Sequence, residues 1–234
     1  MKKSFLVLTL AVCVAGGVFA QSLFSIGAGG ILNFGEVGNN SAERGRTTGE
    51  DVTSELTYGG FVFFDATFVD LSVAIVTGST TSLATLGGSK IERNSSVTAL
   101  DFTLLGKYPI ALGDTFTFFP LLGLGYNYVL SVEYDNIPTD LLGIMSYAPV
   151  TKISAADWSA FRFHLGVGGD LDLSKKVYLR GQLLGSYRFA SPAIQEKSKI
   201  YKPVLSYLAE GANIPVDASG GFGGTVKIAI GFRF

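Results

Sequence analysis

His164 is the only histidine in the chain, and by type it is the residue best suited to acid–base catalysis. Gly166, and not a serine, stands two residues further along, so the local spacing contains no pair of nucleophile and base. A metal site needs several clustered ligands, which His164 and the only cysteine, Cys13, do not supply. The sequence therefore predicts no catalytic residue, no metal site and no cofactor, and we expect His164 to form hydrogen bonds inside the fold.

The charged residues occupy alternate positions within otherwise apolar segments. Side chains two residues apart share one face of a β-strand, so this spacing separates each segment into two faces. No charged residue falls in the apolar set of any segment. The alternation predicts eight strands, each with one apolar and one mixed face, over residues 22–35, 55–68, 69–77, 97–109, 115–129, 160–171, 177–189 and 220–234.

The apolar faces are too extensive for the core of a soluble sandwich of this length. Charged residues make up only 16% of the chain and the mean hydropathy is +0.38, yet no long uncharged apolar run follows the N-terminal segment. A lysine or arginine facing lipid costs about 2–4 kcal/mol at mid-bilayer, which accounts for their absence from the apolar set. We expect the apolar faces to contact lipid and the mixed faces to line an enclosed interior.

Short and long links alternate along the chain. Short links are expected near residues 65–68, 109–114 and 172–176, and long links near residues 36–54, 77–95, 130–157 and 190–219. This order predicts an all-β fold, a closed antiparallel up-and-down transmembrane β-barrel of eight strands, or of ten if one of the last two long links contains a further hairpin. Aromatic residues of the apolar set gather near both ends of the predicted strands, as expected at membrane–water boundaries.

The first twenty residues are typical of a secretory signal. Lys2 and Lys3 precede an apolar stretch that ends in "GGVFA", which predicts cleavage after Ala20. Residues 1–20 would then be a signal peptide and residues 21–234 the mature barrel domain. Lipid attachment at Cys13 is the alternative. The 18 basic and 19 acidic residues of the chain exclude a strongly basic nucleic-acid binder.

The last ten residues, "TVKIAIGFRF", form an alternating strand that ends on an aromatic residue. This ending resembles the C-terminal signature of bacterial outer-membrane β-barrels, and the whole pattern is most similar to their small eight-stranded group of the OmpA transmembrane domain, OmpX and OmpW type. The resemblance implies that the barrel-assembly machinery reads Phe232 and Phe234 as an assembly signal. It also implies residence in the outer membrane of a diderm bacterium, with both termini periplasmic and the long loops extracellular.

The mixed faces predict a network of charges in the lumen. Near mid-height we place Asp101, His164, Arg180 and Lys227; towards the loop-side mouth, Arg162 and Arg188; and towards the turn side, Asp70, Lys107, Asp170 and Arg233. These groups must be paired or hydrated, and an eight-stranded barrel is just wide enough for side chains to fill it. A plug of ion pairs and a narrow, anion-favouring path both fit the sequence. A pocket for a small apolar ligand is a third reading, lined by Phe61, Phe63, Leu105, Phe119, Leu121 and Leu184.

These observations leave three functional hypotheses. The first is an integral outer-membrane protein with a structural or surface-interaction role, whose long loops are candidates for binding an extracellular ligand. The second is a narrow porin-like conduit for small anionic or apolar solutes. The third, a lipid-modifying outer-membrane enzyme, would depend on His164, which points inward by its position in the alternation. The non-enzymatic readings are favoured.

Overall fold

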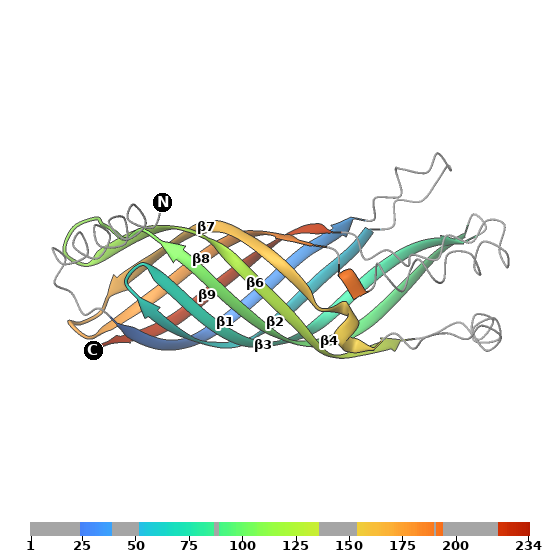
Figure 1. Cartoon of the computed structure of the whole chain (residues 1–234), viewed down its shortest axis with the longest axis horizontal. Helices are drawn as coiled ribbons and strands as arrows, with labels where there is room; N and C mark the ends of the chain where they lie inside the picture. Colours follow the sequence, from blue (N-terminus) through green and yellow to red (C-terminus); the bar gives the residue numbers. More distant parts are fainter. Residues whose placement is uncertain (1–23, 39–51, 87–88, 136–153, 190, 194–219) are drawn as a thin grey trace, which may run out of the picture.

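The structure, a computed structural model, is an all-β barrel that describes residues 24–38, 52–86, 89–135, 154–189, 191–193 and 220–234 (Figure 1). None of the helices in this described part of the chain is long and apolar enough to cross a membrane. A short 3-10 helix, η2, spans Ala155–Trp158. The strands are β1 (Ser25–Gly38), β2 (Val52–Ala66), β3 (Val69–Leu86), β4 (Ser89–Lys107), β5 (Ile110–Ala111), β6 (Phe116–Asp135), β7 (Ala160–Asp172), β8 (Val177–Arg188) and β9 (Gly221–Arg233).

Antiparallel pairing closes the sheet. The strand order is β4-β3-β2-β1-β9-β8-β7-β6-β5, and a further pairing of β4 with β6 completes the ring. The first and last long strands join in register, with Ile26 opposite Phe232. The ninth strand, β5, is a two-residue segment alongside β6 that leaves the ring unchanged. This confirms the predicted closed barrel of eight strands, while most of the two links considered for a further hairpin lies outside the described residues.

The second predicted long link, residues 77–95, is wrong. Residues 77–86 and 89–95 form strand, and β3 and β4 stay paired out to Leu86 and Ser89. Threonine favours the extended backbone, which explains how a Ser/Thr-rich stretch continues two strands. β6 follows them as far as Asp135, beside Asn94. We call residues 77–86, 89–98 and 131–135 the ribbon, which runs beyond the other strands at the end opposite the C-terminus (Figure 1).

A β-bulge marks the base of the ribbon on β6. Thr98 pairs with Ser131 whereas Ala99 pairs with Val129, so Leu130 has no partner on β4. The extra residue reverses the alternation, so that Ser131, like Leu130, is exposed. The bulge lies at the point where β6 leaves the barrel wall.

The two faces of each strand have the predicted chemistry. Val62, Leu165 and Ile228 point outward and are 59%, 61% and 59% exposed. Leu105 and Phe119 point inward and are fully buried. A soluble protein would instead bury its large apolar side chains and expose its charged ones.

Aromatic rings fill the interior by lying over glycines of the neighbouring strand. Phe119 of β6 is paired with Gly168 of β7, where an added Cβ would lie 2.8 Å from Phe119 Cζ. Tyr178 of β8 lies over Gly231 of β9 in the same way. Contacts this short leave no room for a methyl group, so these glycines are needed for the narrow lumen to accommodate large rings.

Candidate functional site

Arg180 on β8 is the centre of an ion-pair cluster in the turn-side half of the lumen. Its guanidinium donates from Nε and Nη2 to the two carboxylate oxygens of Asp170 at 2.8 Å each, and from Nη1 to Asp70 at 2.8 Å. It also pairs with Asp65, which accepts from Lys107 as well. We call these five residues the Arg180 cluster. Five strands, β2, β3, β4, β7 and β8, each contribute one charge to the cluster. The Arg180 side chain is only 1% exposed, so its guanidinium is shielded from bulk water.

Three aromatic rings enclose the Arg180 guanidinium. The Cζ atom lies 4.7 Å from the centroid of Phe63, 5.2 Å from that of Tyr178 and 5.3 Å from that of Phe119. The electron-rich faces of these rings stabilise a cation at this distance. Tyr178 is held in place by a 2.6 Å hydrogen bond between its hydroxyl and that of Ser25.

A second network, the Asp101 cluster, fills the loop-side half. Asp101 accepts hydrogen bonds from Asn33 at 3.1 Å and Asn127 at 3.0 Å, and lies 3.5 Å from Arg162. Arg162 also donates to Glu55 at 3.1 Å. The carboxylate of Asp101 is thus surrounded by amide and guanidinium donors, which compensate for its burial.

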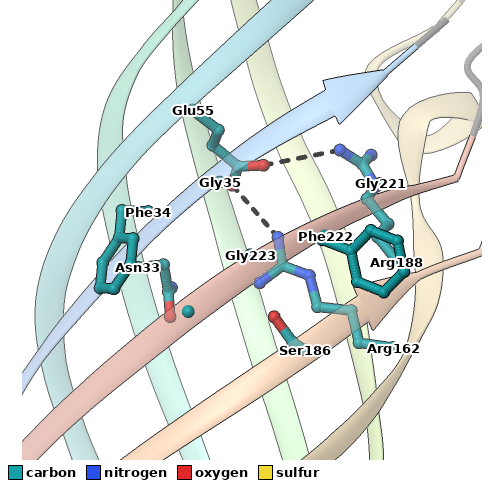
Figure 2. A pocket seen from close by; sticks show the side chains of 11 residues that line it. Asn33, Phe34, Gly35, Glu55, Arg162, Ser186, Arg188, Gly221, Phe222 and Gly223 are labelled. Atoms are coloured by element: carbon teal, nitrogen blue, oxygen red, sulfur yellow. Dashed lines mark hydrogen bonds and ion pairs between the residues drawn. The ribbon is translucent and has the colours of Figure 1, made fainter.

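Glu55 links this cluster to the loop-side mouth. It pairs with Arg188 at 3.6 Å in addition to Arg162, and Figure 2 shows its carboxylate between the two guanidinium groups. Arg188 donates in turn to the main-chain oxygen of Trp158 in η2 at 2.7 Å. Trp158 and Ala155 of η2 both pack against the buried apolar cluster of the interior, so η2 is anchored to the barrel.

Lys227 and His164 lie between the two clusters. The ammonium group of Lys227 donates to Ser72 at 2.8 Å and lies 5.3 Å from the ring centroid of Phe61. His164 is 4% exposed, and its Nδ1 has no hydrogen-bond partner within the part of the chain that the structure describes. A histidine that catalyses lipid modification would have to contact lipid. His164 faces the interior of the barrel and does not.

The structure brings together some of the residues singled out from the sequence and separates others. Asp101 and Arg162 pair directly, and Arg188 joins them through Glu55. Arg180 was expected at mid-height beside Asp101, but its long side chain reaches the turn-side aspartates instead. The lumen charges predicted from the sequence include neither Asp65 nor Glu55. Asp65 continues the inward alternation after Phe61 and Phe63, and Glu55 is two residues before inward Thr57, so the alternation could have found both. The sequence prediction also did not name Tyr178, whose ring lies beside the Arg180 guanidinium.

Little space remains inside the described lumen. A cavity of about 20 Å³ lies beside Glu55, Arg162 and Arg188, which is enough for one water molecule. The residues predicted to line an apolar pocket are instead buried in two packed clusters, and none of them is more than 5% exposed. One cluster contains Phe61 and Phe63, and the other consists of Leu105, Phe119, Leu121 and Leu184. Among the described residues, no group of three or more histidine, cysteine or carboxylate side chains forms a candidate metal site.

The exterior is an apolar belt bounded by aromatic residues. Phe24 stacks on Phe64 at the turn side with ring centroids 5.8 Å apart, and Tyr187 meets Phe222 at the loop side at 5.0 Å. From Phe24 to Phe34 the strand rises about 34 Å at roughly 3.4 Å per residue, which a tilt of about 40° reduces to about 26 Å. Membrane barrels carry an apolar band about 25 Å tall.

A closed antiparallel barrel with an apolar exterior and a charged, filled interior defines the architecture of the small eight-stranded outer-membrane barrels. No protein-family model and no curated protein matches this chain. Similar solved structures include Ail, the attachment invasion locus protein of Yersinia pestis, in complex with the heparin analogue sucrose octasulfate (9% identity, 92% of this chain, 99% of that chain, TM-score 0.36). The N-terminal β-barrel domain of Pseudomonas aeruginosa OprF is another (11% identity, 92% of this chain, 100% of that chain, TM-score 0.33). The strand pairing described above establishes the closed barrel fold of this chain.

Proposed function

We propose that this protein is an integral outer-membrane β-barrel whose lumen is plugged and whose role is structural or surface-interacting. The observation that carries the proposal is the apolar belt around a closed ring of strands. Exposing such an apolar surface to water is unfavourable. The hydrocarbon core of a bilayer is apolar, and the height of the belt agrees with that of the apolar band of membrane barrels. The plug supports a role other than transport, because the Arg180 and Asp101 clusters occupy the lumen at two levels.

Contact with lipid is tested by spin labels at Leu165 and Ile228, introduced as cysteines. Both labels should be accessible to oxygen dissolved in the bilayer and protected from a water-soluble nickel chelate. A label in place of exposed Ser96, on the ribbon, should be accessible to the chelate and serves as the control. Contact of the Leu165 and Ile228 labels with water would refute the proposal.

The plugged lumen is tested by planar-bilayer recording on refolded protein. We expect no discrete conductance steps from the wild-type protein. Steps that change in size or ion selectivity in Lys227→Glu would instead establish the alternative, a narrow conduit for anions. Phe161→Ala, which alters only an exposed side chain, is the matched control.

The same proposal orients the protein in the membrane. The C-terminus lies at the end of the barrel with the short turns (Figure 1), which we assign to the periplasm. The ribbon and the long links are then extracellular and available to a ligand. Cleavage after Ala20 and recognition of Phe232 and Phe234 by the barrel-assembly machinery complete the proposal. Deletion of Phe234 should reduce the amount of folded protein in the outer membrane without preventing refolding in detergent; equal amounts in the membrane would contradict this part of the proposal.

A further inference from the structure

The outward chemistry of three adjacent strands changes at one level. On β3 the last apolar outward residue is Ile75, and the next outward residue is Thr77. On β4 the last apolar outward residue is Leu100, and the next one towards the ribbon is Thr98. These residues are register partners, Ile75 with Leu100 and Thr77 with Thr98. On β6, Ser131 stands opposite Thr98. Because the change from apolar to polar side chains falls at register partners on neighbouring strands, it indicates a boundary between two environments outside the barrel.

Beyond this level the outward surface of the ribbon consists of hydroxyl and amide side chains. We call it the polar face: Thr77, Ser79, Thr81, Asn94, Ser96 and Thr98. The strands hold these groups in rows, with the hydroxyls of Thr77 and Thr98 3.4 Å apart and that of Thr81 donating to Asn94 at 2.8 Å. Because strand pairing fixes the rows, the polar face is an ordered array of side chains.

The polar face lies at the height of lipid headgroups. From Thr77 to Thr81 β3 rises about 14 Å, or about 10 Å along the barrel axis at a tilt of about 40°. The headgroup layer on each side of the hydrocarbon core is about 5–8 Å thick. The polar face therefore spans this layer immediately above the apolar belt.

The chemistry of the polar face selects among headgroups. Each hydroxyl and amide both donates and accepts, as the hydroxyls of a sugar do. A phosphate would call for lysine or arginine. The polar face contains neither, and the nearby outward residue on β6 is Glu133, an exposed carboxylate. The array thus matches an uncharged, hydroxyl-rich partner.

We infer that the polar face binds the saccharide headgroups of glycolipids in the outer leaflet, an inference that rests on the membrane placement proposed above. The binding would surround one side of the barrel with an ordered layer of sugar. It would also fix the depth at which the barrel sits, because sugar contacts begin where acyl-chain contacts end.

The test is native mass spectrometry of the protein released from mixed vesicles of diglucosyl diacylglycerol and phosphatidylglycerol. Wild type should retain the glycolipid in preference to the phospholipid. The fourfold variant Thr77→Val, Ser79→Ala, Ser96→Ala, Thr98→Val should lose about tenfold of this preference, since one or two net hydrogen bonds are worth about that factor. The control, Thr80→Val with Ser95→Ala, alters hydroxyls on the opposite face of the ribbon and should bind as wild type does.

The outcomes separate this inference from the proposed function. If the protein inserts into vesicles but retains both lipids equally, or if the fourfold variant keeps the preference, the inference is wrong and the membrane placement stands. If the protein fails to insert into vesicles of either lipid, the membrane placement itself is wrong. Circular dichroism of both variants establishes that the strands have formed.

Discussion

Replacing Arg180 with methionine should destabilise the barrel by about 3–5 kcal/mol, the range for removing one partner of a buried ion pair. Methionine retains much of the side-chain volume but removes every donor. Asp170 then loses both of its hydrogen bonds from Arg180, while Asp70 retains Gln182, which donates at 3.0 Å. The cluster holds three carboxylates against two cations, so the substitution leaves one cation, Lys107, for three buried negative charges.

The assay is urea unfolding in phospholipid vesicles, followed by circular dichroism and by the fluorescence of Trp158, the single tryptophan. The variant should unfold at a lower urea concentration, with an unchanged dependence of the free energy of unfolding on urea concentration. Combining Arg180→Met with Asp170→Asn should recover at least about 1 kcal/mol, because it removes an uncompensated charge. If Arg180→Met unfolds at the wild-type urea concentration, the Arg180 cluster contributes nothing to stability and the reasoning is refuted.

Two further pairs of substitutions, each a test with its control, probe the interior packing and the lipid-facing surface. Gly168→Val should destabilise the barrel by about 1–3 kcal/mol through overpacking against Phe119, whereas Gly181→Ala, where no atom lies within 4 Å of the added Cβ, should change the urea midpoint little; equal effects of the two would contradict the packing argument. Leu165→Arg should cost about 2–4 kcal/mol in vesicles and Leu173→Arg, in a turn at the belt edge, about 0–1 kcal/mol. A Leu165→Arg variant as stable as wild type would show that this position does not face hydrocarbon.

Alternation alone was enough to predict which residues of each strand face inward. The reason is local: side chains two apart share a face, so an inward Arg162 implies an inward His164 whatever the rest of the fold does. The eight strands and their closure follow from the same pattern, since an apolar exterior tolerates no unpaired edge.

The pairing of lumen charges could not be predicted in this way. Which carboxylate meets Arg180 depends on the relative height of β2, β3, β7 and β8, and so on the stagger of strands around the ring. Glu55 and Asp65 stand at the two ends of the apolar run of β2, and the prediction did not include them among the lumen charges. Nor does the local sequence show that the stretch after Ile75 remains strand, because serine, threonine and glycine are equally common in loops.

Arg180 also links folding to insertion. Its partners Asp70 and Asp65 precede it by 110 and 115 residues, so these contacts form only when the first and last hairpins of the chain have come together. An open sheet entering hydrocarbon would carry Asp70 without its arginine and would leave Asp65 with Lys107 alone. The nascent protein therefore gains most by curling into a ring before it leaves the aqueous phase, and a partially inserted sheet is the state of highest free energy along the route.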